Sequence, residues 1–171
     1  SSDGCEGNSF DLTVTVEPKP IINNKVVDTC SGESFMVNLS NNIPQEIVPA
    51  NTLYTWNILS GQSDLADLTG YSDQTTGVSE ISQNITNLSD ETKIIIYEVI
   101  PESGACIGEA FEVEVSISPE PIIENLTTSP ICSEDTFLVS PQNGVPNGNT
   151  IVPAGTTYTW TVEDNPNITG E

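Results

Sequence analysis

Hydrophobic and polar residues alternate over several short stretches of this chain. Four hydrophobic residues in 111–118 alternate with glutamate and serine, and residues 53–58 alternate in the same way. A period of two predicts strands with one buried face and one solvated face. We therefore expect strands at 21–28, 34–40, 52–59, 78–88, 93–100 and 109–118, with a short strand near 67–70.

No stretch holds a helical period of apolar residues for long, and 12 glycines and 12 prolines punctuate the chain. Gly61, Gly70, Gly77 and Gly104 mark expected turns. Six or seven strands in about 100 residues are typical of an immunoglobulin-like β-sandwich. The predicted fold class is therefore all-β, with tandem immunoglobulin-like sandwich repeats of about 100 residues. The residues predicted to anchor the core are Trp56, Tyr54, Phe35, Phe111 and Trp160.

The sequence aligns with itself in four ordered blocks. Residues 5–22 match 106–123 at an offset of 101, and residues 30–37 match 132–139 at an offset of 102. Residues 47–56 (IVPANTLYTW) match 151–160 (IVPAGTTYTW) at an offset of 104, and a short block at 67–70 echoes 167–170. This period is too long for a solenoid unit and has the size of one sandwich domain.

An alternating strand in each copy is followed by two prolines that are separated by one residue. They lie at positions 18 and 20 and again at 119 and 121. Proline fixes φ, so this pattern predicts a semi-rigid linker. We expect residues 1–18 to be the C-terminal strand of a preceding repeat, 19–118 a complete repeat, and 119–171 the N-terminal half of a following repeat. Stiff linkers between strongly negative units predict an extended, beaded rod.

The charge of the chain excludes many chemistries. Its 171 residues carry 25 acidic residues, three lysines, no arginine and no histidine, for a formal charge of −22. A Ser-His-Asp triad, a histidine-ligated metal and an arginine finger are therefore impossible. A basic surface for nucleic acid is missing as well. No apolar run approaches the ~20 residues of a membrane span.

The acidic residues are scattered. The nearest approach to a site is the 64–73 loop, with Asp64, Asp67 and Asp73, whose oxygens could serve calcium. The loop lacks the D-x-D-x-D-G pattern, and its second copy does not repeat the three acids, which favours a solvated acidic loop. We expect no catalytic site, no metal and no cofactor, and hence no enzyme.

Four cysteines occupy two equivalent positions in each copy, and no C-x-x-C pair occurs. An exported protein would oxidise them. A disulfide between Cys30 and Cys106, inside the complete repeat, is the favoured pairing, with Cys5 and Cys132 joined to cysteines outside this sequence. A clamp across each linker, Cys5–Cys30 and Cys106–Cys132, is a second possibility, and free thiols are a third.

The linked pattern C-x-G-x-x-F-x-V-x-V-x-x-P-x-P-I-I, then C-x-x-x-x-F-x-V, then IVPAGTTYTW and N-I-T-G, covers most of the chain. It resembles the PKD-like repeats of giant surface adhesins in gliding Bacteroidota, the SprB-type gliding-motility proteins. The run Gly70-Tyr-Ser-Asp-Gln-Thr-Thr-Gly77 is similar to this family as well. The two copies differ at residues 32 and 134 and at residues 51 and 155.

The resemblance implies a non-enzymatic stalk segment of a giant cell-surface adhesin, used in gliding motility and surface attachment. Such proteins are exported by the type IX secretion system and anchored at the outer membrane. The implied partners are neighbouring repeats, the outer-membrane gliding and secretion machinery and a surface polysaccharide, with no nucleic acid.

The alternative is a spacer or carbohydrate-binding module of a secreted polysaccharide-degrading enzyme. A glycan-binding module exposes a planar aromatic platform. Aromatic residues make up only 6% of this chain, and those at 35, 54 and 56 recur in the second copy. This recurrence favours a role in the core.

Overall fold

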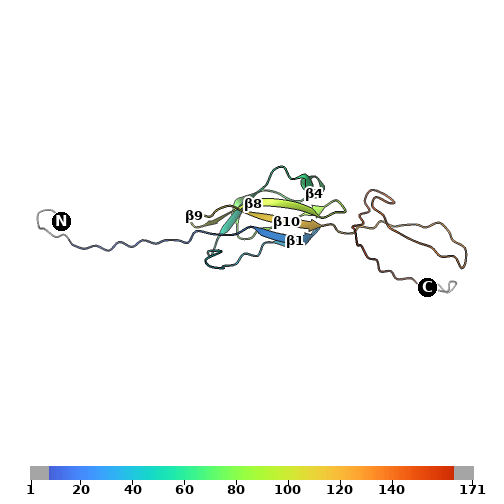
Figure 1. The fold of residues 1–171 in the computed structure, drawn as a ribbon, viewed down its shortest axis with the longest axis horizontal. Coiled ribbons are helices and arrows are strands. Elements are labelled where there is room, and N and C mark those ends of the chain that lie inside the picture. Colours follow the sequence, from blue (N-terminus) through green and yellow to red (C-terminus); the bar gives the residue numbers. More distant parts are fainter. Residues whose placement is uncertain (1–7, 164–171) are drawn as a thin grey trace.

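The computed structural model describes residues 8–163, and its regular structure lies almost wholly in strands. Figure 1 shows one sandwich, with a chain segment leaving each end of it. The strands are β1 (Lys25–Cys30), β2 (Ser34–Met36), β3 (Leu53–Ile58), β4 (Leu68–Thr69), β5 (Gln74–Val78), β6 (Ser82–Asn84), β7 (Thr86–Asn87), β8 (Lys93–Ser103), β9 (Cys106–Ile107) and β10 (Phe111–Ser118), with a 3₁₀ helix η1 (Ser63–Asp67) before β4.

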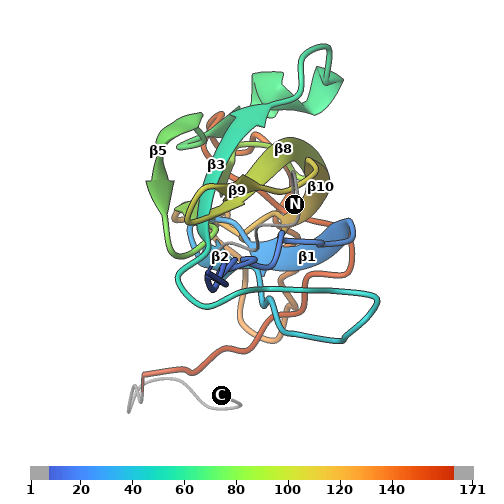
Figure 2. The ribbon, with the colours of Figure 1, turned by 90° about the vertical axis from the view of Figure 1, so that its left-hand side faces the viewer.

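One layer of the sandwich is a mixed sheet in the order β1-β10-β8-β3-β5, with β9 paired to β8. Strands β1 and β10 run parallel, and the other pairs in this sheet are antiparallel. Two small sheets, β2-β6 and β4-β7, supply the second layer. Figure 2 views the sandwich from the end where β9 lies, with β2 apart from the row that runs from β5 to β1.

The core lies between these layers and is made by alternate residues of the strands. Strand β10 alternates as expected, with buried residues at 111, 113, 115 and 117. Fifteen hydrophobic residues between 22 and 117 form a single buried cluster. The structure thus confirms the predicted all-β, immunoglobulin-like sandwich of about 100 residues.

The expected single strand at 78–88 is wrong in its bounds. The chain instead forms β5, β6 and β7 in turn, and these three strands belong to three different sheets. Ile81 and Ile85 both face the core and are 2% and 0% exposed. Residues 81, 83, 85 and 87 are all buried or half-buried, so the period of two holds here although the chain passes from one small sheet to the other.

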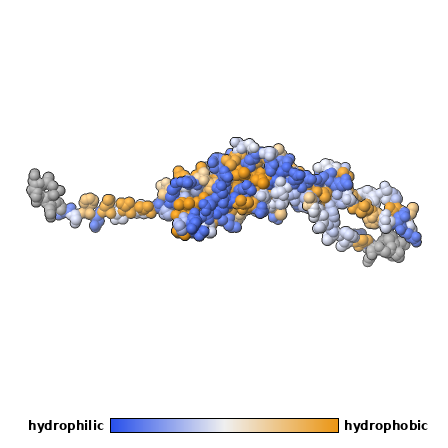
Figure 3. Space-filling model, viewed as in Figure 1, coloured by the Kyte–Doolittle hydropathy of each residue, from blue (hydrophilic) through white to orange (hydrophobic). Residues whose placement is uncertain are grey.

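Residues 8–18 leave the sandwich as an extended segment that forms no strand. Their apolar residues Phe10, Leu12, Val14 and Val16 are between 71% and 85% exposed, and they give this segment its hydrophobic colour in Figure 3. The equivalent residues of β10, 101 positions later, are all buried. The contrast arises because β1 and β8 flank β10, whereas no strand of the described residues pairs with residues 8–18.

Trp160 does not anchor a core in this structure, contrary to the sequence-based expectation. Its side chain is 82% exposed, whereas the equivalent Trp56 is 4% exposed. Trp56 is covered because β3 pairs with β5 and β8. Residues 152–163 form no strand, and no sheet of the described residues includes them, so Trp160 stays uncovered in this part of the chain.

The local structure of residues 119–163 nevertheless repeats that of the complete repeat. An isolated bridge joins Ile122 to Ile151, as another joins Ile21 to Ile47. The Thr156 hydroxyl donates to the Pro153 carbonyl at 2.7 Å, as the Thr52 hydroxyl does to Pro49. Positive φ recurs at two pairs of equivalent positions whose residue types differ: Gly32 (79°) with Glu134 (74°), and Asn51 (62°) with Gly155 (83°). These local matches support the repeat in the sequence.

Candidate functional site at the two ends of the sandwich

The sandwich offers no aromatic platform to a flat ligand. None of the six aromatic side chains of residues 25–118 is exposed, and Trp56 donates its indole N–H to the Ser72 carbonyl at 3.1 Å. A hollow of about 430 Å³ lies beside β2, but only Tyr54 among its lining residues is aromatic, and Tyr54 is 4% exposed. This geometry does not favour carbohydrate binding.

The three acids of the 64–73 loop serve the local structure. Asp64 accepts the backbone N–H of Ile94 at 3.0 Å, and Asp73 accepts that of Ile58 at 2.8 Å. Asp67 pairs with Lys93 at 2.9 Å. Each carboxylate therefore binds near the end of a strand, and the three do not converge. Across residues 8–163, no group of three potential metal-ligating side chains is found.

Lys25 and Glu46 form the least exposed ion pair of the described residues, with Nζ and Oε1 2.6 Å apart. The same Oε1 accepts the backbone N–H of Asn23 at 3.0 Å. The hydrogen bond from Lys25, aided by that from Asn23, lowers the pKa of the Glu46 carboxyl below its usual range. The pair ties the 41–48 loop to the start of β1.

The end of the sandwich that receives the linker is built around Pro20, which is almost completely buried. Pro20 lies against Gly108, where a Cβ would stand 2.9 Å from the Pro20 carbonyl oxygen and 2.6 Å from Cγ of Pro101. The Gly108 N–H donates to the Pro101 carbonyl at 2.8 Å. Only glycine leaves room for both prolines, so the linker packs closely against Gly108. We call this contact of Pro20 with Gly108 and Pro101 the linker seat.

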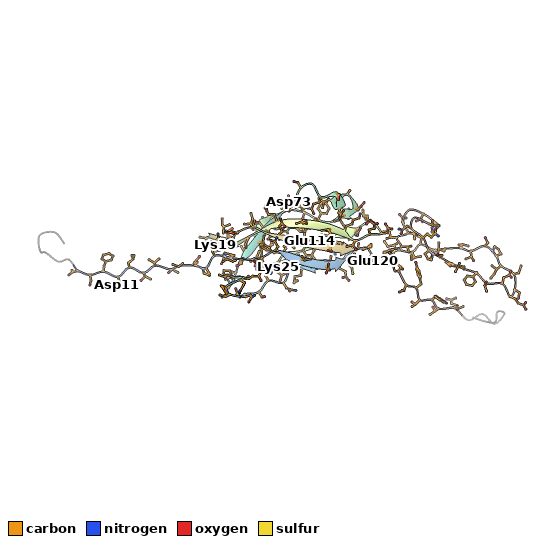
Figure 4. The ribbon with its side chains drawn as sticks, in the orientation of Figure 1. Asp11, Lys19, Lys25, Asp73, Glu114 and Glu120 are labelled. Atoms are coloured by element: carbon orange, nitrogen blue, oxygen red, sulfur yellow. The ribbon has the colours of Figure 1, made fainter. Side chains whose placement is uncertain are left out.

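The turn between β8 and β9 extends this seat along the linker. Gly104, at φ 59°, lies so close to the Glu17 carboxylate that a Cβ would stand 2.6 Å from Oε2. The Cys106 thiol lies 3.8 Å from the Glu17 carbonyl oxygen. Lys19, at this end in Figure 4, lies 3.9 Å from Glu109. The linker therefore contacts the sandwich at Glu17, Lys19 and Pro20, and of these only Pro20 is buried.

The opposite end holds the exit of β10 through a buried polar network. Asn87 is 2% exposed, and its side-chain amide donates to the carbonyls of Ile117 and Glu91 at 2.9 and 2.8 Å. The Ser31 hydroxyl accepts the Asn87 N–H at 2.9 Å. The Ser31 N–H in turn donates to the Ser118 carbonyl at 2.8 Å. Glu120, labelled in Figure 4, follows at this end.

The predicted disulfide between Cys30 and Cys106 is wrong, since both are free thiols in the structure. Cys30 ends β1 opposite Ser118, whereas Cys106 pairs with Ser103 at the far end of β8. The ten-residue step along β8 sets them about 33 Å apart. A disulfide tolerates at most about 7 Å between Cα atoms. Cys132 is a free thiol too, and Cys5 lies outside the described residues.

Sequence reasoning missed the polar side chains that tie the loops to the sheet. Gln62 bonds both the N–H and the carbonyl of Ile96, at 2.6 and 3.0 Å. Gln83 accepts the Tyr97 hydroxyl at 2.7 Å. These residues follow no period and have no charge, so no pattern could single them out. Gly108 could have been found, because a glycine and the double proline recur together in both copies.

The other predicted core anchors, Tyr54, Trp56, Phe35 and Phe111, are 3–4% exposed. Across the described residues no helix is long and apolar enough to cross a membrane.

A two-layer sandwich of short strands, whose first and last strands run parallel and side by side, is typical of an immunoglobulin-like domain. The profile of the PKD-like domain matches residues 25–121, more than half of the chain. The protein therefore belongs to the PKD-like domain family. No curated protein matches the chain. A PKD-like domain fits a structural or spacer segment of a surface protein.

Proposed function

We propose that this chain is a non-enzymatic stalk segment of a giant bacterial surface adhesin that serves gliding motility and attachment. Its direct partners are the neighbouring repeats of the same polypeptide. The parent protein is anchored at the outer membrane, exported by the type IX machinery, and moved by the gliding apparatus. The contact with a surface polysaccharide belongs to other parts of that protein.

The observation that carries the proposal is the placement of the two linkers. Pro20 is seated at one end of the sandwich, and Ser118 leaves β10 at the other. Repeats joined in this way add length in one direction. The second observation is charge: a net charge of −22 in 171 residues repels non-neighbouring units and keeps a long array open.

The experiment uses antibodies against residues 19–118 and a deletion of the encoding gene in the source bacterium. We expect the antibodies to label intact cells, added protease to remove the label, and the deletion to stop cells from gliding on glass. Label that requires permeabilised cells, or normal gliding of the deletion strain, would overturn the proposal.

The carbohydrate-binding alternative has its own test. Titration of residues 19–118 with a panel of soluble polysaccharides, followed by isothermal titration calorimetry, would reveal a glycan site wherever it lies. We expect no binding heat, because none of the aromatic side chains of residues 25–118 is exposed. Saturable binding at micromolar concentrations would favour the alternative over the stalk.

A further inference from the structure

The two cysteines of the complete repeat lie at the two ends that take part in joints. Cys30 is exposed at the last position of β1, directly opposite Ser118, the residue before the outgoing linker. Cys106 is half-buried in the β8–β9 turn, at the end where the incoming linker is seated. Figure 1 shows β9 and the forward ends of β1 and β10 at opposite ends of the sandwich.

The repeat offset relates these two ends to one another. Glu17 is the equivalent of Ser118, because residues 5–22 match 106–123 at an offset of 101. In the complete repeat, the Ser118 carbonyl accepts the N–H of Ser31, the residue after Cys30, at 2.8 Å. At the incoming joint, the Cys106 thiol lies 3.8 Å from the equivalent carbonyl oxygen, that of Glu17.

In a continuous array of repeats, the carbonyl at the position of Glu17 and Ser118 would therefore lie beside two cysteines. The cysteine equivalent to Cys30 comes from the preceding repeat, and Cys106 comes from the repeat that follows it. Ordinary backbone dimensions place the Cα of the first within about 9 Å of the Cys106 thiol as an upper bound. A disulfide needs a Cα–Cα distance of about 4.4–6.8 Å, so side-chain rotation and an adjustment at the linker must close the rest of the gap.

We propose that Cys106 forms a disulfide with the cysteine of the preceding repeat that is equivalent to Cys30, so that each joint of the array is stapled. The same geometry pairs Cys30 with the Cys106 equivalent of the next repeat. Cys30 and Cys106 form no disulfide within the described residues, so both sulfurs are available for such a bond. The proposal rests on the repeat in the sequence and is independent of the adhesin role.

The oxidation needs a two-electron acceptor, and a small-molecule disulfide such as oxidised glutathione supplies it. One cysteine thiolate attacks this disulfide and releases one glutathione thiolate. The second cysteine thiolate then attacks the protein sulfur of the mixed disulfide and releases the other glutathione. Two protein thiols become one disulfide, and one oxidised glutathione becomes two reduced glutathiones.

The test uses a tandem protein in which residues 20–120 are followed directly by residues 20–121, so that Pro20 of the second copy takes the place of Pro121. Each copy contains the whole sheet and all fifteen residues of the buried hydrophobic cluster, so each has its own core. The protein is equilibrated with oxidised and reduced glutathione, blocked with a thiol reagent, and mapped by mass spectrometry without reduction.

We expect one disulfide, between Cys30 of the first copy and Cys106 of the second, with the other two cysteines blocked as thiols. The matched variants are Cys30→Ser in the first copy and Cys30→Ser in the second. The first should abolish the crosslink and the second should retain it. Both should unfold at the same urea concentration after reduction, because Cys30 is exposed.

Four results would overturn the proposal. They are four free thiols after oxidation, a crosslink within one copy, a crosslink only between separate molecules, and a disulfide that still forms after Cys30→Ser in the first copy. None of these results bears on whether the parent protein serves gliding, since that is read out on cells.

Discussion

The replacement Gly108→Ala tests the linker seat most directly. The added Cβ would stand 2.6 Å from Cγ of Pro101 and 2.9 and 3.2 Å from the carbonyl oxygen and Cβ of Pro20. Both neighbours are proline rings or backbone, which cannot swing aside as a flexible side chain would. Pro101 lies inside β8 and is itself almost completely buried. The strain therefore falls on Pro20, which must leave its seat.

The cost follows from two estimates that agree. Overpacking of a well-packed site costs about 1–3 kcal/mol. Expulsion of Pro20 exposes roughly 100 Å² of apolar surface, which at about 25 cal/mol per Å² gives ~2.5 kcal/mol. We expect Gly108→Ala to lower the free energy of unfolding by about 2 kcal/mol. For a domain of this size that corresponds to a fall in Tm of about 10 °C.

Urea unfolding followed by tryptophan fluorescence measures this change. Trp56 is buried and Trp160 is 82% exposed, so a Trp160→Phe background leaves Trp56 as the reporter. Gly148→Ala is the matched control, because its Cβ would meet nothing within 4 Å. If Gly108→Ala unfolds at the same urea concentration as Gly148→Ala, the linker is not seated as described and the argument for a held joint fails.

Three further predictions address the polar network, the ion pair and the shape of the array. Asn87→Ala should lower the free energy of unfolding by about 3 kcal/mol in urea titrations, since it removes the buried amide that donates to the Ile117 and Glu91 carbonyls, whereas Asn38→Ala at an exposed position should change it by less than about 0.5 kcal/mol. The pKa of Glu46 is lowered in the folded state, so the stability that its pair with Lys25 contributes is present above the unfolded pKa of about 4.3 and is lost as the pH falls through the folded value. Glu46→Gln should therefore flatten this part of the curve of stability against pH. An unchanged curve would refute the assignment. Small-angle scattering of three tandem copies should give a radius of gyration above about 30 Å, because each sandwich is as long as the ~35 Å of β8, and a value near the ~19 Å of one globule would exclude the rod.

The correct predictions came from patterns that a strand with one buried face and one solvated face produces. The alternation in 111–118 identified β10 and its buried face, because β10 lies between two strands and under the second layer. The recurrence of Trp56 in the second copy pointed to the core. These features depend only on local period and on the repeat, and both can be read without knowing which strands are neighbours.

The incorrect predictions depend on which strands are neighbours, and the hydrophobic pattern of the sequence does not show this. Gly77 was expected in a turn but lies in β5, where a Cβ would stand 3.0 Å from Cβ of Leu53. The pairing of Cys30 with Cys106 failed because both residues belong to one repeat while their ends face different neighbours. The prediction that Trp160 is buried was wrong because one face of an alternating segment is buried only where partner strands are present. Each error concerns which element lies beside which.

The parallel pairing of β1 and β10 connects the fold to a role in a stalk. Tension on an array pulls the start of β1 through Pro20 and the end of β10 through Ser118, toward opposite ends of the sandwich. Because the two strands run parallel and side by side, this force shears their ladder along its length. Six register pairs, from Lys25–Val113 to Cys30–Ser118, must then break together and cannot open one by one. A stapled joint would pass tension from Cys30, at the end of this ladder, to Cys106 of the next repeat, which lies in β9 beside β8. The residues that hold the linkers, and those proposed to staple them, thus lie where a pulled chain needs its strongest attachments.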